Sequence, residues 1–291
     1  MVCLEKENLQ GKREEKKIIV NAIIHSYKNP NLLAVVERLL ASTSQSVHIS
    51  ILDQHPMDRT EKFKNLVNVF YEHKFWDHID GPTWFKEETI FSKKFDAKYT
   101  LLLTDDTSLR DGWLEDCTSF INDNPSIFIS GKGKREFFNL DDYFIGHNES
   151  SSSTFGMSHL TDRLFMFGLT ETFTRTGYPR DIKYFGEEEK MSMRLLEKGI
   201  ATYSAPSDLY EDLGLRTIEN LYCPFSKEHN YNTMIDMLST DIGKEWLSLL
   251  KIDEPPIKLF HQINDVGYDP TSLQMNELGG ERFIAKTKAI Y

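Results

Sequence analysis

The pattern of apolar and polar residues along the chain predicts strands and helices in turn. Continuous apolar runs rich in β-branched residues are typical of buried strands, and apolar residues at intervals of three and four are typical of helices. The pattern predicts strands at 18–25, 46–52, 98–104, 126–130, 163–168 and 201–204, and helices at 31–41, 61–73, 83–95, 111–122 and 187–198. Because the two kinds of element alternate with short connections, the sequence predicts an α/β fold with a mostly parallel central sheet flanked by helices.

The same pattern divides the chain into three parts. Residues 1–17 are polar and charged, and this leader lacks the apolar core of a secretory signal. Residues 18–213 contain all the predicted strands and form one α/β domain, in which the pattern weakens over 131–162. We expect that stretch to be a flexible segment over the ligand-binding edge of the sheet. Residues 214–291 show no second core and are predicted to form a helical C-terminal extension.

Composition narrows the classes of partner. The 291 residues include 34 basic and 45 acidic side chains, a net charge of −11, which gives no general attraction to nucleic acid or to an anionic membrane. The 3 cysteines are far apart and form no CxxC pair, which argues against a disulfide framework or a zinc site. No apolar run approaches the length of about 18 residues that a membrane span requires. We therefore expect a cytoplasmic globular protein with no membrane partner.

The most informative stretch is the predicted strand at 98–104, because it ends on two adjacent carboxylates, Asp105 and Asp106. Open α/β sheets bind ligands at the carboxyl ends of their strands, and a buried carboxylate is costly, so we expect this pair at the rim of the sheet. Carboxylate oxygens together with substrate phosphates are the usual ligands of Mg²⁺ and Mn²⁺. The pair thus indicates a divalent metal site, and the alternative is that one of the two aspartates caps the following turn.

Two further acidic stretches have more than one interpretation. Glu187, Glu188 and Glu189 begin a predicted helix, where the helix macrodipole alone favours them. The functional interpretation is that Glu187 or Glu188 faces a cleft and accepts hydrogen bonds from sugar or acceptor hydroxyls. Glu211 and Asp212 come shortly after the last predicted strand, and they either add a metal ligand or belong to a solvated turn.

These stretches, taken together, resemble the GT-A-fold glycosyltransferases. The resemblance is strongest to the polypeptide α-N-acetylglucosaminyltransferase family that modifies hydroxyproline on a cytoplasmic F-box adaptor, and it covers about residues 18–215. The order and spacing of several motifs carry it: Ser26–Pro30, Gly81–Lys86, Thr104–Asp106 with Gly112–Trp113, Phe185–Glu188 with Arg194 and Gly199, and Tyr203–Pro206. The resemblance implies a Rossmann-like GT-A domain over 18–213 and a retaining transfer from a UDP-sugar, with Mn²⁺ or Mg²⁺ as cofactor.

The resemblance also implies roles for individual residues. Thr104 stands at the first acidic position of the family's metal motif, which leaves Asp106 as the main metal ligand and Asp105 for the metal or the ribose. Glu211 or Asp212 replaces the family's late histidine ligand, and Lys86 replaces an arginine, so that it meets a phosphate as a point charge. The implied donor-binding residues are Ser26, Tyr27, Asp53, Gln54, Trp84, Lys86 and Asp105, and the implied catalytic carboxylates are Glu187 and Glu188.

Three functions stay open at this stage. By resemblance, the acceptor of the sugar is a hydroxyl on a protein side chain. A second acceptor class is 5-hydroxymethylcytosine or hydroxycytosine in phage DNA, which would receive glucose or arabinose in the cytoplasm of the host. The basic cluster of Lys132, Lys134 and Arg135 would then contact phosphates, and the target base would leave the stack. A further alternative is a non-catalytic nucleotide-binding module, in which Asp106→Asn leaves the biological activity intact.

Overall fold

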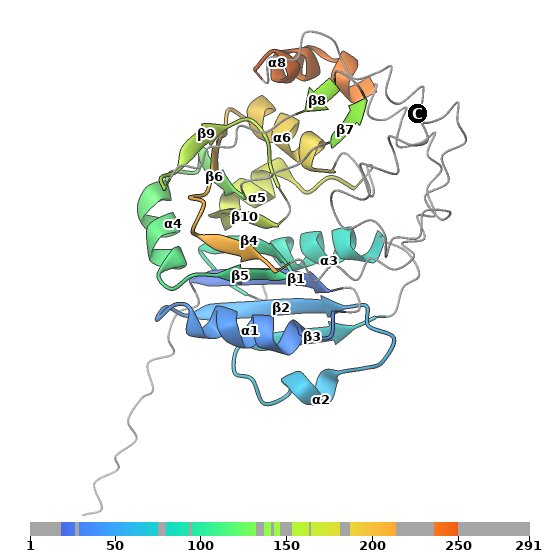
Figure 1. Cartoon of the computed structure of the whole chain (residues 1–291), viewed down its shortest axis with the longest axis vertical. Coiled ribbons are helices and arrows are strands. Elements are labelled where there is room, and N and C mark those ends of the chain that lie inside the picture. Colours follow the sequence, from blue (N-terminus) through green and yellow to red (C-terminus); the bar gives the residue numbers. More distant parts are fainter. Residues whose placement is uncertain are drawn as a thin grey trace, which may run out of the picture.

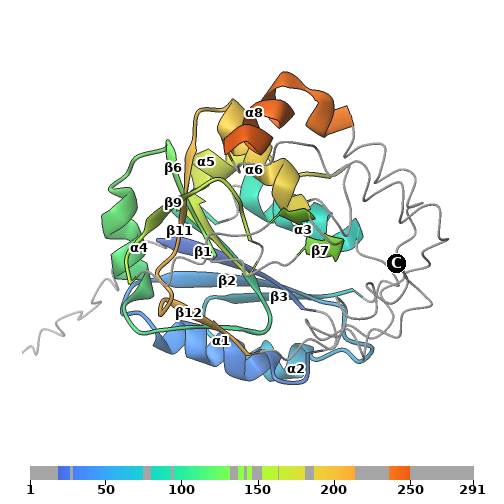
Figure 2. The same ribbon diagram turned by 45° about the horizontal axis from the view of Figure 1, so that its top comes forward.

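The computed structural model describes residues 19–26, 29–74, 80–92, 95–131, 137–140, 143–145, 153–162, 164–180, 187–213 and 236–249. Its strands are β1 (Val20–Ser26), β2 (Val47–Asp53), β3 (Val69–His73), β4 (Tyr99–Thr104), β5 (Thr107–Leu109), β6 (Ile127–Ser130), β7 (Phe137–Leu140), β8 (Tyr143–Ile145), β9 (Gly156–Ser158), β10 (Phe165–Leu169), β11 (Ala201–Ser204) and β12 (Tyr210–Asp212). Its helices are α1 (Leu32–Ala41), α2 (Thr60–Phe63), α3 (Asp80–Phe91), α4 (Trp113–Ile121), α5 (Thr170–Thr176), α6 (Glu187–Glu197) and α8 (Asp241–Leu249). Figures 1 and 2 show the sheet crossing the middle of the molecule between these helices.

Within the described residues, the central sheet has eight strands in the order β3-β2-β1-β4-β10-β6-β11-β9. The pairs β1–β2, β1–β4, β2–β3 and β6–β11 are parallel, whereas β10 is antiparallel to β4 and β6, and β9 is antiparallel to β11. The prediction of a mostly parallel sheet is therefore confirmed. The carboxyl ends of β1, β2 and β4 consequently lie next to one another at the same edge of the sheet.

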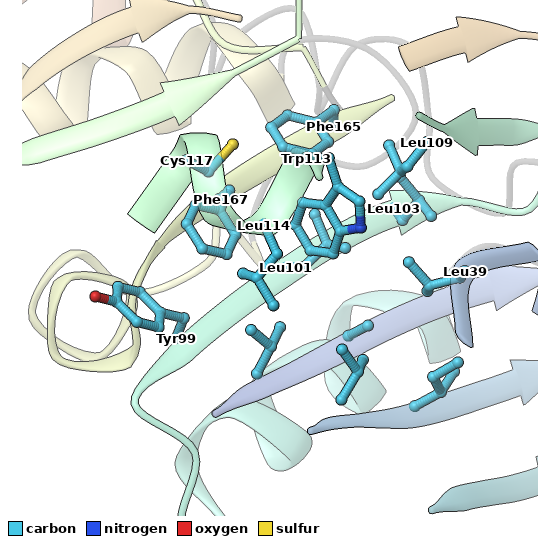
Figure 3. Packing of buried hydrophobic residues seen from close by; sticks show 14 of the residues in the cluster. Leu39, Tyr99, Leu101, Leu103, Leu109, Trp113, Leu114, Cys117, Phe165 and Phe167 are labelled. Carbon is cyan, nitrogen blue, oxygen red and sulfur yellow. The ribbon is translucent and has the colours of Figure 1, made fainter. Parts of the chain in front are cut away.

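Both faces of this sheet are covered. Leu101 and Leu103 of β4 belong to the core cluster on the side of α1 and α4, and Leu102 belongs to the cluster on the side of α3, α5 and α6. Trp113 of α4 packs edge-on against Phe165 and Phe167 (Figure 3). The centroid of its ring lies 6.3 Å from that of Phe165 and 5.8 Å from that of Phe167. Such burial on two sides favours a continuous apolar strand, as in Leu101–Leu103 of β4.

The predicted helix at 61–73 is wrong beyond Phe63. Helix α2 ends at Phe63, and the chain forms the edge strand β3 from Val69 to His73, paired with β2. Asn68 adopts a left-handed backbone with a φ of 65°, which no helix continues through, and its carbonyl accepts a hydrogen bond from the amide of Ile49 at 2.8 Å. The aromatic and β-branched residues after Asn68 suit a strand, and pairing with β2 outweighs their helical spacing.

Other parts of the prediction differ in detail. The sequence pattern did not indicate α5, or the two-stranded sheet that β12 forms with β5. The stretch 131–162 contains β7, β8 and β9, and its remaining residues are described only in part. The leader at 1–17 lies outside the described residues, as does most of the expected helical extension at 214–291. The described part of this extension includes α8, which packs on α6 through Trp246 and Leu247.

Candidate functional site

Three neighbouring strands of the central sheet end at or next to predicted donor-site residues, namely Ser26, Asp53 and Asp105. The register pairs Ser26 at the end of β1 with Asp53 at the end of β2, and it pairs His25 with Thr104 at the end of β4. Ser26, Asp53 and the turn after Thr104 therefore lie at one edge. This is the edge at which open α/β sheets bind ligands.

Asp105 and Asp106 form the turn between β4 and β5. The hydroxyls of Thr104 and Thr107 lie 2.7 Å apart across this turn, and the carbonyl of Asp106 accepts a hydrogen bond from the amide of Leu213 at 2.8 Å. Asp106 is buried, with 4% of its surface exposed, whereas Asp105 is partly exposed. The expectation of a carboxylate pair at the rim therefore describes Asp105 better than Asp106.

Strand β12 brings one predicted metal ligand next to this turn. In the β5–β12 register Asp212 pairs with Thr107, the residue after Asp106, and Glu211 pairs with Ser108. Glu211 is exposed, and Asp212 is described through its backbone position alone. Of these two alternatives, Asp212 is thus the nearer to Asp106 along the strand register.

The donor set at this edge fits a hard divalent cation. Among the described residues, no three histidine, cysteine, aspartate or glutamate side chains form a closed metal cage. Mg²⁺ and Mn²⁺ differ from caged metals because they are usually bound by one or two carboxylates, and substrate phosphates and water complete the coordination. The carboxylates of Asp105 and Asp106 offer that kind of partial ligand set.

The end of β1 provides a buried polar atom. Ser26 is fully buried, and its Oγ has no hydrogen-bond partner among the described residues. Leaving such a group unsatisfied costs about 1–3 kcal/mol, so its place at the ligand edge fits a polar atom of a bound molecule. Gln54 is also buried, and its Oε1 lies 2.6 Å from Nε2 of His25. Tyr27 lies outside the described residues.

The carboxylate of Asp53 is surrounded by protein donors. Arg59 donates from Nε to Oδ2 and from Nη2 to Oδ1, both at 2.7 Å, and the Tyr71 hydroxyl donates to Oδ2 at 2.6 Å. Burial and the bond to Asp53 raise the pKa of the Tyr71 phenol. The contact of Asp53 with a nucleotide stays a prediction, while its contact with Arg59 is present in the structure. No local pattern in the sequence pointed to Arg59.

A second group joins α3 to the start of α6. Lys86 donates from Nζ to the hydroxyl of Tyr178 at 3.2 Å, and its ammonium lies 4.9 Å from the centroid of that ring. The Tyr178 hydroxyl in turn donates to Oε2 of Glu187 at 3.2 Å. Two residues singled out from the sequence, Lys86 and Glu187, are therefore connected through one buried phenol that the sequence pattern did not indicate.

Trp84 lies on α3 beside this group. Its side chain is 55% exposed, so it is not part of the core. The guanidinium of Arg180 stacks over the Trp84 ring at 4.1 Å and forms an ion pair with Glu87. Arg180 and Tyr178 flank Pro179 in a connection that has no periodic pattern, which explains why neither residue was predicted.

The start of α6 is held by backbone contacts of Glu188. The carbonyl of Glu188 accepts hydrogen bonds from the hydroxyls of Thr161 at 2.8 Å and Ser192 at 2.7 Å. Glu188 is buried, with 3% of its surface exposed, and Glu187 is 9% exposed. Glu187 is therefore the more accessible of the two predicted catalytic carboxylates.

Two predictions about partners concern other parts of the chain. The basic cluster of Lys132, Lys134 and Arg135 lies outside the described residues. Among the helices that the structure does describe, none combines the length and the apolar character needed to cross a bilayer.

Solved structures share the fold of this chain. No protein-family model and no curated protein matches the sequence. The structure of S. aureus TarS residues 1–349 is similar with a TM-score of 0.53 and 16% identity, over 94% of this chain and 88% of that one. The structure of GalNAc-T7 with UDP, GalNAc and Mn²⁺ is similar with a TM-score of 0.58 and 10% identity, over 95% of this chain and 55% of that one. The predicted GT-A fold is confirmed, and the resemblance to the hydroxyproline-modifying family stays a prediction.

Proposed function

We propose that this chain is a glycosyltransferase that moves a sugar from a UDP-sugar to a hydroxyl on a macromolecule, with Mn²⁺ or Mg²⁺ as cofactor. The observation that carries the proposal is the acidic turn of Asp105 and Asp106 at the ligand edge of a GT-A sheet, with Asp212 next to it in register. GalNAc-T7, which shares the fold, was crystallised with UDP and Mn²⁺.

The residues of the strand ends would hold the diphosphate and the cation. Asp106 and Asp105 bind the cation, and Asp212 is favoured over Glu211 as a further ligand because it lies beside the turn. When bound, the cation neutralises the charge that develops on the departing diphosphate. Lys86 provides a second positive charge for a phosphate.

The nucleoside and the acceptor would meet other groups. Ser26 offers a hydroxyl that has no partner in the described part of the chain, and the backbone amide of Gln54 donates to the carbonyl of Ser26 at 2.8 Å. Trp84 exposes a ring that can stack on the base or the sugar. Glu187, oriented by Tyr178, accepts a hydrogen bond from an acceptor or sugar hydroxyl.

The stereochemistry and acceptor follow from the family resemblance. We propose a retaining transfer in which the departing phosphate helps to deprotonate the acceptor, and a protein side chain as that acceptor. No described residue favours hydroxymethylated DNA over protein, since the basic cluster that suggested it lies outside the described part of the chain.

A thermal-shift panel of UDP-sugars with and without Mn²⁺ tests the proposal. A ligand that binds only the folded state stabilises it by about 2.7 kcal/mol when its free concentration is 100 times its Kd. Because we assign the diphosphate of the donor to the bound cation, the matching UDP-sugar should raise the Tm only when Mn²⁺ is present. Asp106→Asn should abolish this shift and the release of UDP. Asp111→Asn makes the same chemical change at a site that is 77% exposed, and it should leave both intact.

Two outcomes would contradict the proposal in different ways. If no UDP-sugar raises the Tm of the wild-type protein with Mn²⁺, the chain does not use this donor class. If a UDP-sugar binds with Mn²⁺ but Asp106→Asn keeps the full biological activity, the chain is a non-catalytic nucleotide-binding module on the same fold.

A further inference from the structure

A buried arginine at the ligand-binding edge of the sheet connects the end of β2 to the loop after β1. Arg59 donates a hydrogen bond to each carboxylate oxygen of Asp53 at 2.7 Å, and its Nη1 donates to the carbonyl of Asn29 at 2.5 Å. Arg59 is 6% exposed and Asp53 is fully buried. A guanidinium held in this forked geometry is fixed in direction as well as position. The loop after β1 is thereby tied to the end of β2.

Asn29 extends this connection to the acidic turn. Its Nδ2 donates to the carbonyl of Asp105 at 2.5 Å, and its Oδ1 accepts a hydrogen bond from the amide of Asn31 at 2.7 Å. With 2% of its surface exposed, Asn29 has both ends of its carboxamide engaged. The orientation of the carboxamide is therefore fixed, and so is the peptide between Asp105 and Asp106.

The position of that peptide matters for metal binding. It joins the two residues whose carboxylates we assign to the cation, so a displacement of this turn would move both side chains. Groups that orient metal ligands typically change metal affinity 10- to 100-fold when they are removed. The contact between Asn29 and Asp105 holds the turn after β4 from a separate segment, the loop after β1. We therefore expect its removal to have such an effect.

We infer that Arg59 and Asn29 are positioning residues, which hold the Asp105–Asp106 turn in the geometry that binds the divalent cation. Arg59 fixes the loop after β1 through Asp53, and Asn29 passes this constraint to the carbonyl of Asp105. The inference rests on the proposed metal-dependent function. It assigns to Asp53 a role within the protein, in addition to any contact with the nucleotide.

Asn29→Ser is the variant that separates positioning from folding. A serine hydroxyl can still accept the hydrogen bond from the amide two residues on, but it is too short to reach Asp105. Arg59→Lys keeps the charge and loses the fork, but it also disturbs a buried ion pair and so separates positioning from folding less cleanly. The matched control is Asn31→Ala, because Asn31 is exposed and contributes its backbone amide to this contact.

Two measurements on the full-length variants decide the inference. The dissociation constant of Mn²⁺ in the presence of UDP should rise about tenfold or more in Asn29→Ser and stay within twofold in Asn31→Ala. Hydrogen exchange of the peptide spanning Thr104–Thr107, measured without metal, should become faster in Asn29→Ser alone.

Unchanged exchange and unchanged Mn²⁺ affinity in a folded Asn29→Ser protein would overturn the inference and leave the proposed function standing. Faster exchange with an unchanged Mn²⁺ affinity would also overturn it, because the contact would then stabilise the loop without affecting the metal. If the wild-type protein binds neither Mn²⁺ nor UDP, the proposed function itself fails, and the positioning role fails with it.

Discussion

Tyr178 connects an ammonium and a carboxylate that come from two different helices. Its hydroxyl accepts a hydrogen bond from Lys86 of α3 and donates one to Glu187 of α6. Hydrogen bonds to charged groups contribute about 1.5–3 kcal/mol, more than bonds between neutral groups do. A single phenol thus influences the direction of both side chains that we assign to the phosphate and the acceptor.

Removing this hydroxyl should affect transfer more than folding. We expect Tyr178→Phe to lower kcat/KM roughly 10- to 100-fold, as the loss of one such bond in the transition state predicts. The ring stays in the core against α6, so the Tm should change by only a few degrees. Steady-state kinetics of UDP release and a thermal melt measure the two effects.

Tyr203→Phe is the matched control for this change. Tyr203 lies on β11 and its ring packs on Phe120, on the face of the sheet opposite to Tyr178. The control should keep wild-type kcat/KM. Equal rates in the Tyr178 and Tyr203 variants would show that the Lys86–Tyr178–Glu187 connection has no part in transfer.

At the scale of elements, the edge strand β3 depends on one unusual backbone conformation. Asn68 adopts a φ of 65° just before the strand, and asparagine and glycine tolerate this region better than other residues. The side chain is exposed, so a substitution there changes the backbone preference without changing the packing.

We therefore expect Asn68→Val to lower the free energy of unfolding by about 1–2 kcal/mol and Asn68→Gly to leave it nearly unchanged. Urea denaturation of the two variants measures the difference. Asn65→Val is the control, because Asn65 is exposed in the same connection and does not have a positive φ. A loss of stability in Asn65→Val as large as that in Asn68→Val would mean that the backbone conformation of Asn68 is not the cause.

The same element shows what sequence patterns reveal and what they leave out. The strands of the central sheet were predicted well where they are buried, and α6 ends as predicted, with Gly199 at a φ of 66°. The apolar spacing at 61–73 wrongly predicted a helix, because the pairing of β3 with β2 is a long-range contact that a local pattern does not contain. Arg59 and Tyr178 act through such contacts as well, so only the folded chain could show their partners.

At the scale of the whole molecule, Trp246 and Trp84 differ in burial, and we assign the first to the stability of the fold and the second to the donor. Trp246 of α8 is 1% exposed, donates from Nε1 to the carbonyl of His159 at 2.6 Å, and packs with Met193 of α6. Met193 lies six residues after Glu187 along α6, a rise of about 9 Å at 1.5 Å per residue. Trp84, on α3, exposes 55% of its surface.

The two tryptophans should consequently respond to truncation in opposite ways. We expect Trp246→Ala to lower the free energy of unfolding by about 3–5 kcal/mol, the usual cost of emptying a buried aromatic site, and to leave the Kd of the UDP-sugar within twofold at a temperature where the variant is folded. Trp84→Ala should change stability by about 0.5–1 kcal/mol, since its ring stacks on an exposed Arg180, and should raise that Kd tenfold or more. Denaturation curves and calorimetric titration measure both quantities for both variants.

If Trp84→Ala binds the donor as wild type does, the exposed ring has no part in donor binding. If Trp246→Ala instead weakens donor binding while its stability is unchanged, α8 belongs to the site and not to the support of α6.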